Sequence, residues 1–468
     1  MAHAPDRPCD CTRRSFLKGA LSATAGAAAF GALGPLARLA RAQELNPDAP
    51  DLYHIFCYFS GGWDTLLSLD PRDPSEFHNG NLRTTRIQPA YDQLVGSDGR
   101  LVEVESSRGA RFTFGPHIGG LAQHVDRLAV VRGMSMETLT HEVGRRRFLT
   151  GVPPSGLQAR GSSAATWIAD RLGGGDPIPN LSLQVESYNR SLAHYATALR
   201  VNSVADLLRA LRPSEPLLAT RLDQQIDAHL TDGALCPAAS KSPIWGAGEA
   251  ARGKARGMVG RGYADRFDFG ARTDEMAALR DHYGITGNAT VGTPEVQAAF
   301  AARAITGGVS RCVSIRVASA LDTHYNNWAT DQGPEQERGF NAVARLVDDL
   351  AARPYPGGTG ESWLDHTTIL GFSEFSRTAL LNPNDGRDHS LTNACFLLGA
   401  GVKGGTIAGS SSDVALTPRA IDLETGLADP DGSVPRPEHV LQGLLARSGI
   451  GEEADLRVPP LTAIFQPI

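Results

Sequence analysis

The feature that most constrains the fold is an alternation of short apolar runs with longer stretches that have helical spacing. The apolar runs, rich in strand-forming residues, are 52–59, 127–132, 312–319 and 367–372, with 394–398 as a further candidate. The helical patterns are 163–172, 204–211, 293–306, 340–351 and 438–448. Continuous apolar runs indicate strands buried on both faces, and their alternation with helices is typical of a parallel sheet covered by helices. The sequence therefore predicts an α/β fold with a mostly parallel central sheet.

One long segment, 191–293, departs from this alternation. It carries polar helical patterns, a stretch rich in Gly, Ala and Arg at 246–261, and few β-branched runs. We interpret it as a helical insertion in one large domain that spans 43–468. A lid over the sheet and a surface elaboration without function are both compatible with this pattern.

The N-terminal residues have the order of a twin-arginine export signal. Residues 12–18 read TRRSFLK, an Ala- and Gly-rich apolar segment follows at 19–33, and 40–42 is a small-x-small cleavage site. This order predicts that 1–42 is removed and that the twin-arginine translocase exports the folded chain to the periplasm or beyond. Because that route serves proteins that acquire a metal or cofactor before crossing, it favours a metal site.

Charge and hydropathy narrow the choice of partners. The net charge is −6 and both signs are mixed along the chain, so no nucleic-acid surface is predicted. After the signal, no run approaches the ~20 apolar residues that a permanent membrane span needs. The expected partners are the translocase during export and an anionic small-molecule or polymer substrate.

Acidic residues and histidines gather in turns that follow the predicted strands. These candidate metal ligands are Asp64, Asp322, His324, Glu374, Asp388 and His389. Loops at the carboxyl ends of parallel strands meet in one crevice, so we expect these side chains to converge. Asp322 and His324 also fit the alternative role of capping the next helix.

Carboxylate and imidazole ligands without cysteine suit Zn²⁺, Mn²⁺ or Fe²⁺, or Ca²⁺ or Mg²⁺ where histidine is sparse. Six such groups exceed what one tetrahedral ion needs, which favours a centre with two divalent ions. Arg377 and Arg387 lie close to these ligands in sequence and are candidates for contacts to an anionic group.

A hydroxyl nucleophile is expected after another strand. Thr140 follows the run 127–132 and precedes a helical pattern, with Ser135 and Thr138 as rivals. A hydroxyl beside a metal ion and a helix N-terminus is a candidate to attack phosphorus or sulfur. The alternative is an ordinary helix N-cap.

Taken together, these motifs resemble an exported family known as domain of unknown function 1501. The segments that carry the resemblance, besides the twin-arginine leader, are 61–64 (GGWD), 322–324 (DTH), 373–378 (SEFSRT), 386–389 (GRDH) and 399–405 (GAGVKGG). The resemblance implies a place beside alkaline phosphatases and sulfatases, with an α/β sandwich and a bimetal centre fed by loops at the strand ends.

The superfamily pattern implies a role for several positions. Asp64 resembles the ligand after the first strand, and Thr140 sits where related phosphodiesterases have their nucleophile. Asp322 and His324 resemble the pair on the other ion, and His389 resembles the last histidine.

The chain also departs from that pattern. Glu374 replaces an aspartate, Phe375 stands where a metal-binding histidine is usual, and the Asp-x-His spacing of Asp322 and His324 is shorter than Asp-x-x-x-His. A Cys/Ser-x-Pro-x-Arg motif is missing, which argues against formylglycine sulfatase chemistry. The sequence predicts an exported metal-dependent hydrolase-like protein acting on a phosphate or sulfate ester. The alternative is a non-catalytic periplasmic binding or assembly protein that keeps the fold.

Overall fold

A computed structural model describes residues 51–212, 220–231, 261–287, 292–451 and 456–467, with a few single positions between these ranges. The predicted signal, 1–42, lies outside the described residues, so twin-arginine export stays a prediction. The chain divides into two compact units, 45–210 with 265–468, and 1–44 with 211–264. In the second unit the structure describes helix α7 (Thr220–Thr231), while most of 232–260 lies outside the described residues. The predicted insertion at 191–293 therefore stays a prediction.

Within the described part of the chain, eight strands form one sheet in the order β12-β4-β11-β8-β1-β7-β5-β6. In sequence order the strands are β1 (Tyr53–Phe59), β4 (Leu128–Ser135), β5 (Asn180–Leu183), β6 (Leu199–Val201), β7 (Cys312–Ala318), β8 (Thr367–Phe372), β11 (Thr392–Gly399) and β12 (Thr406–Ala408). β11 runs antiparallel to β4 and β8, and the other neighbouring pairs are parallel. The predicted α/β class with a mostly parallel central sheet is confirmed.

Two short antiparallel pairs lie outside this sheet. One joins β2 (Val102–Glu105) to β3 (Arg111–Phe114), and the other joins β9 (Ser376–Arg377) to β10 (His389–Ser390). In the second pair Arg377 lies opposite His389, so two residues that the sequence picks out are neighbours.

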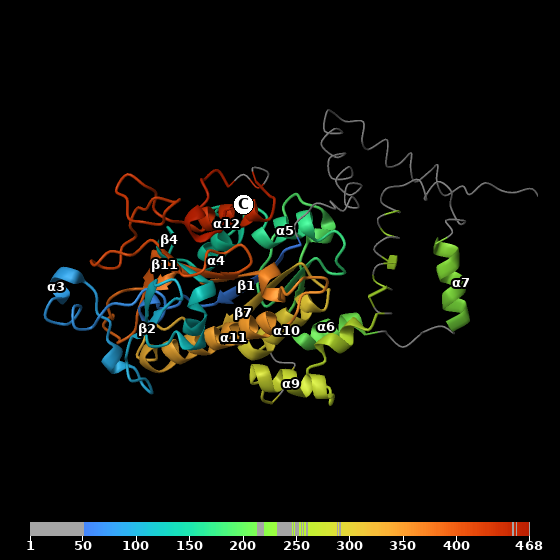
Figure 1. Cartoon of the computed structure of the whole chain (residues 1–468), viewed down its shortest axis with the longest axis horizontal. Coiled ribbons are helices and arrows are strands. Elements are labelled where there is room, and N and C mark those ends of the chain that lie inside the picture. Colours follow the sequence, from blue (N-terminus) through green and yellow to red (C-terminus); the bar gives the residue numbers. More distant parts are fainter. Residues whose placement is uncertain are drawn as a thin grey trace, which may run out of the picture. The chain divides into compact units, whose positions relative to one another are not determined.

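Helices cover both faces of the sheet (Figure 1). The remaining described helices are α3 (Leu82–Thr85), α4 (His141–Thr150), α5 (Ala164–Leu172), α6 (Val204–Leu211), α9 (Asp274–Tyr283), α10 (Pro294–Thr306), α11 (Gly333–Ala352) and α12 (Pro437–Arg447). Helices α4, α5 and α12 pack on one another over one face, where Phe56 and Tyr58 of β1 join their apolar residues. Helices α10 and α11 pack on β7 from the other face, where Phe59 contacts Phe340 of α11. Burial of both faces explains why β1 reads as one apolar run.

The sequence did not predict several short strands or the start of one helix. β5, β6 and β12 have only three or four residues each and carry polar side chains, so no apolar run marks them. Helix α11 begins at Gly333 rather than at 340, after a turn of π-helix at Trp328–Gln332. Gly333 and Pro334 in the first turn hide this start, although proline is well tolerated there.

The direction of β11 decides which side chains meet. β1, β4, β7 and β8 all end at one edge of the sheet, and β11 begins at that edge because it runs antiparallel to them. His389 precedes β11 in the chain and still lies beside the loops that follow the parallel strands.

No helix among the residues that the structure describes is long and apolar enough to cross a membrane.

Candidate metal centre

The loop after β1 packs directly on the loop after β7. Its turn passes through Gly61, whose φ is +114°. A Cβ atom at Gly61 would lie 2.8 Å from the backbone nitrogen of Asp322. Only glycine meets both conditions without strain, so the Gly61 turn fixes Asp322 against the first strand.

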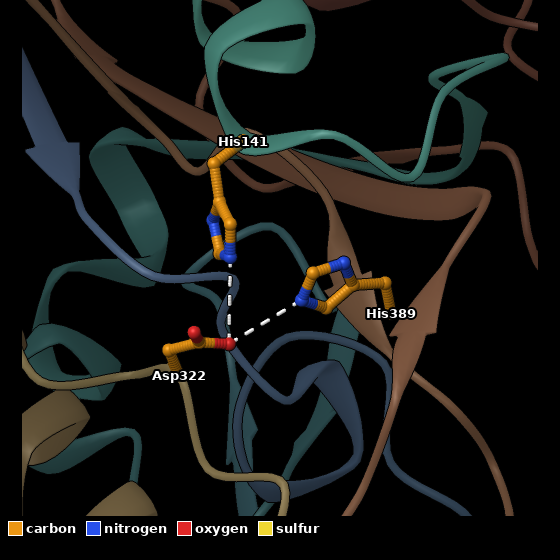
Figure 2. Close-up of side chains that lie close together, drawn as sticks. All are labelled: His141, Asp322 and His389. Carbon is orange, nitrogen blue, oxygen red and sulfur yellow. Dashed lines mark hydrogen bonds and ion pairs between the residues drawn. The ribbon is translucent and has the colours of Figure 1, made fainter.

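His141, Asp322 and His389 form a compact cluster at this edge (Figure 2). One ligand atom from each lies within 4.8 Å of the other two. Nε2 of His141 is 3.4 Å from Oδ1 of Asp322, and Nε2 of His389 is 3.3 Å from the same oxygen. Two ligands of one tetrahedral zinc ion lie about 3.4 Å apart. The spacing therefore fits a shared metal ion.

His324 adds a further nitrogen to this cluster. Its Nε2 is 3.0 Å from Oδ1 of Asp322 and 3.0 Å from Nε2 of His389. Two imidazole nitrogens at this distance need a proton or a cation between them, because otherwise their lone pairs face each other. We call His141, Asp322, His324 and His389 the histidine cluster.

Each imidazole of the histidine cluster is held from behind by an oxygen acceptor. The Nδ1 contacts are His141 to Glu374 Oε1 at 2.8 Å, His389 to the Leu139 carbonyl at 2.7 Å, and His324 to Asp388 Oδ1 at 2.8 Å. A carbonyl or carboxylate only accepts, so each Nδ1 carries the donated proton. In the neutral imidazole this leaves the lone pair on Nε2, and outer contacts of this kind orient metal-binding histidines. At His324 this lone pair also faces Nη1 of Arg377, at 3.4 Å.

Glu374 lies behind the cluster and is 1% exposed. Its Oε1 also accepts the Gly61 N–H at 2.9 Å, and its Oε2 accepts the Ser373 hydroxyl at 3.0 Å. The sequence predicts Glu374 and Asp388 as direct ligands, but the structure places both on the outer nitrogen of a histidine. These contacts favour an orienting role for the two carboxylates.

The charges of the cluster act on one another. Burial opposes protonation of His141, but the hydrogen bond and charge of Glu374 raise its pKa above the ordinary value. Burial lowers the pKa of His389. Burial acts to raise the pKa of Asp322, but the hydrogen bond and charge of Arg377 outweigh it and bring that pKa to about 2. Asp322 is therefore an ionised carboxylate throughout the physiological range.

Arg377 is buried under the cluster, and its side chain has no exposed surface. Its Nη2 donates to Oδ1 of Asp322 at 2.7 Å, its Nε donates to the Gly62 carbonyl at 2.9 Å, and its guanidinium also contacts the carbonyls of Gly61 and Arg387. The sequence proposes Arg377 as a contact to an anionic substrate. In this position it neutralises Asp322, and a contact to a substrate stays a prediction.

Asp64, in the loop after β1, is 1% exposed. Its Oδ1 accepts the backbone N–H of Leu66 at 3.0 Å, and its Oδ2 accepts the indole N–H of Trp328 at 2.8 Å. Nε of Arg387 lies 2.9 Å from the same Oδ2 as an ion pair, although its N–H is not directed along a hydrogen bond. Asp64, a predicted metal ligand, thus has partners on both oxygens.

Phe375 takes part in the site by packing. Its ring centroid lies 4.7 Å from that of His141 and 4.2 Å from that of His389. Where the resemblance leads us to expect a metal-binding histidine, this chain has an aromatic wall against two imidazoles. Packing of this kind restricts the rotamers of the cluster.

Thr140 is exposed at the N-cap position of α4, directly before His141, and its side chain makes no capping hydrogen bond. Its backbone N–H donates to the hydroxyl of Thr138 at 3.1 Å. Ser135 lies at the end of β4, paired with Thr392 of β11. Among the three candidate nucleophiles, Thr140 is the exposed one that adjoins a cluster residue.

His141 is the member of the cluster that the sequence prediction missed. It is the first residue of α4, which follows β4 by five residues. Its position in the sequence could have marked His141 as a site residue, because it follows a strand that runs parallel to β8 and β1. The same kind of position identified Asp322. A histidine beside a threonine at a helix start is easily taken for part of a cap.

Three solved structures are similar to this chain at low identity. A protein from work on the metabolism of multiple glycosaminoglycans by Bacteroides thetaiotaomicron has TM-score 0.36 and 9% identity, covering 89% of this chain and 77% of its own. Ps i-CgsB in complex with k-i-k-neocarrahexaose has TM-score 0.36 and 9% identity, with coverages of 88% and 75%. A protein in the alkaline phosphatase superfamily from Vibrio parahaemolyticus has TM-score 0.34 and 11% identity, with coverages of 90% and 75%.

No curated protein matches the chain. A family model does match it, and the match runs over residues 53–424, from the first residue of β1 to a point beyond β12. This range contains every member of the histidine cluster, together with Arg377 and Arg387. The chain belongs to the family of proteins of unknown function named DUF1501.

Proposed function

We propose that this protein is an exported metal-dependent hydrolase that acts on a phosphate or sulfate ester. One observation carries the proposal: three imidazoles present Nε2 to the carboxylate of Asp322, each with its Nδ1 held by an oxygen acceptor. Three oriented imidazoles and one carboxylate suit Zn²⁺, Mn²⁺ or Fe²⁺ better than Ca²⁺ or Mg²⁺, which take oxygen ligands.

The histidine cluster is accessible from solvent. The side chain of Asp322 is 51% exposed and that of His324 is 32% exposed, whereas Arg377 and Glu374 beneath them are buried. A catalytic metal site needs a position open to substrate, while a structural site is closed by protein ligands. The exposure of this face supports a catalytic role.

A bound divalent cation would supply Lewis-acid polarisation of an ester oxygen and positive charge for an anionic substrate. The chain's own residues do the rest. The histidines and Asp322 hold the cation, Glu374 and Asp388 fix two of the rings, and Arg377 keeps Asp322 ionised. Thr140, exposed at the start of α4, is the candidate nucleophile, with the helix N-terminus favouring its deprotonated form.

One observation favours the alternative, a binding or assembly protein without catalysis. Oδ1 of Asp322, on which the imidazoles converge, also accepts a hydrogen bond from Arg377. A cation bound at this oxygen shares it with a guanidinium, whose positive charge weakens the bond between the carboxylate and the cation. Metal binding without ester hydrolysis would therefore identify the alternative.

The test combines metal content with activity. The full chain, purified without chelator, is subjected to elemental analysis and then assayed with aryl phosphate and aryl sulfate esters before and after chelation. We expect bound metal, and hydrolysis that chelation abolishes and Zn²⁺ or Mn²⁺ restores. His389→Ala removes a cluster ligand and should lose both, whereas His78→Ala alters an exposed histidine outside the cluster and should lose neither. Absence of metal from the unaltered protein would contradict the proposal.

A further inference from the structure

The resemblance stated from the sequence implies two metal ions, with Asp64 as a ligand of one of them. The contacts of Asp64 do not fit that role. Its two oxygens receive a backbone N–H, an indole N–H and the charge of Arg387, and the carboxylate is 1% exposed. An ion at Asp64 would have to displace these partners from a buried position.

Arg387 is itself held in place on every side. Its side chain is fully buried, Nη1 donates to the Thr378 carbonyl at 2.7 Å, and Nη2 donates to the carbonyls of Gln88 and Pro89 at 2.6 and 3.0 Å. Its guanidinium carbon lies 4.6 Å from the centre of the Trp328 ring. The same indole donates to Asp64, so the ring is a wall shared by the pair. A side chain with these contacts cannot swing away to admit an ion without loss of all of them.

The charges at this edge of the sheet also disfavour an ion at Asp64. The carboxylates at this edge are Asp64, Asp322, Glu374 and Asp388, and Arg377 and Arg387 are the buried cations beside them. These six groups leave two net negative charges, which a single divalent ion balances. An ion at Asp64 would lie against Arg387 where both side chains are buried, and like charges repel most strongly where water is excluded. An ion on the histidine cluster also lies near a guanidinium, that of Arg377, but at the half-exposed carboxylate of Asp322.

We infer that Arg387 occupies the place of the second metal ion, so that the centre holds one divalent cation on the histidine cluster and a fixed guanidinium on Asp64. This inference rests on the proposed function for the identity of the first site. Asp64 then orders the turn after β1 by capping the helical turn Thr65–Leu67, and it makes no contribution to metal binding.

The test is the zinc stoichiometry of the full chain, measured by native mass spectrometry after saturation with Zn²⁺ and removal of the excess. The double variant Asp64→Asn/Arg387→Met replaces both charges by neutral side chains of similar size, so neither partner is left as an unpaired buried charge. We expect one zinc ion in the unaltered protein, one in the double variant with the same dissociation constant, and none in Asp322→Asn.

Two zinc ions in the unaltered protein, or loss of the single ion in a folded double variant, would overturn the inference while leaving the proposed function intact. Circular dichroism of the double variant establishes that it is folded. No zinc in any of the three proteins would contradict the proposed function itself, and the inference with it. The stoichiometry of the unaltered protein decides the matter even where a variant fails to fold.

Discussion

Asp64 and Asp322 occupy equivalent places in the fold and have opposite surroundings. Each follows a parallel strand of the sheet, Asp64 after β1 and Asp322 after β7, and each lies near a buried arginine. Asp64 is 1% exposed and has a partner on each oxygen, whereas the side chain of Asp322 is 51% exposed and faces three imidazoles. A strand-end aspartate therefore does not by itself indicate a ligand, because its remaining contacts decide whether an ion has room.

The largest effect should come from breaking the buried pair. Asp64→Ala leaves the fully buried guanidinium of Arg387 without its carboxylate, and removal of one partner of a buried ion pair costs about 3–5 kcal/mol. Chemical denaturation measures this loss in the free energy of unfolding. The control is Asp388→Ala, whose side chain is 56% exposed and whose loss should cost less than about 1 kcal/mol. Equal losses for both variants would remove the distinction between the two environments.

The reverse result is expected for metal binding. Asp322→Asn keeps an oxygen acceptor for Arg377 but removes the negative charge on which the imidazoles converge. Its affinity for Zn²⁺ should fall by more than the roughly 10–100-fold that loss of an outer partner costs. Competition with a chromophoric chelator gives the dissociation constant. An unchanged constant would mean that the ion, if bound, lies elsewhere.

A smaller effect should follow from Glu374, which touches the metal site through His141. Glu374→Gln keeps the shape of the side chain and removes the charge behind the ring. The affinity for Zn²⁺ should fall by roughly 10–100-fold. The neighbouring Ser373→Ala removes a hydroxyl that donates to Glu374 Oε2 and accepts the backbone N–H of Trp63 but leaves the carboxylate charged, so it should change the affinity less. A larger loss in Ser373→Ala than in Glu374→Gln would contradict the orienting role of the carboxylate.

Acid should weaken metal binding gradually through the histidines. The pKa of His141 is raised by Glu374 against the effect of burial, and protonated imidazole cannot bind a metal. The affinity for Zn²⁺ should therefore begin to fall at a pH above the ordinary histidine value of about 6.5. Asp322, with a pKa of about 2, stays ionised in this window. In Glu374→Gln the fall should begin at a lower pH, and an unaltered pH profile would exclude His141 as the titrating ligand.

In the metal-free protein, the stabilising contribution of His141 should fall as pH rises, whereas the affinity for Zn²⁺ rises with pH. A folded-state pKa above the unfolded one means that the folded chain binds the proton more tightly, so His141 contributes stability below the unfolded pKa and loses that contribution as pH rises through the folded pKa. The metal-bound protein needs neutral His141. Thermal denaturation with and without zinc, between pH 6 and 8, measures how the stability of the metal-bound and of the metal-free protein depends on pH.

The sequence was most informative where burial leaves a continuous pattern. β1, β7 and β8 are buried along nearly their whole length, so their apolar runs predicted them within one residue at each end. The direction of β11 could not be predicted, because an apolar run looks alike whichever way the strand runs. The convergence of His389 with Asp322 was expected for strand-end loops in general, and its actual cause is that β11 begins at that edge.

The parts of the site that the sequence did not indicate depend on long-range partners. Asp64 and Arg387 are separated by more than three hundred residues, and a strand-end aspartate looks like a ligand until its ion pair is known. The contact of Glu374 with the outer nitrogen of His141 is likewise a tertiary one, which the sequence cannot indicate. Sequence spacing identified which residues gather at the edge, and only packing separates those facing a cation from those behind.

We expect this edge of the sheet to bind a cation on the histidine cluster and not at Asp64. The most direct measurement is diffraction from zinc-soaked crystals at the zinc absorption edge, which locates each bound ion by its anomalous signal. We expect one strong peak per chain, within ligand distance of His141, Asp322 and His389, with Arg387 still on Asp64. A peak at Asp64, or no peak at the histidine cluster under saturating zinc, would contradict this expectation.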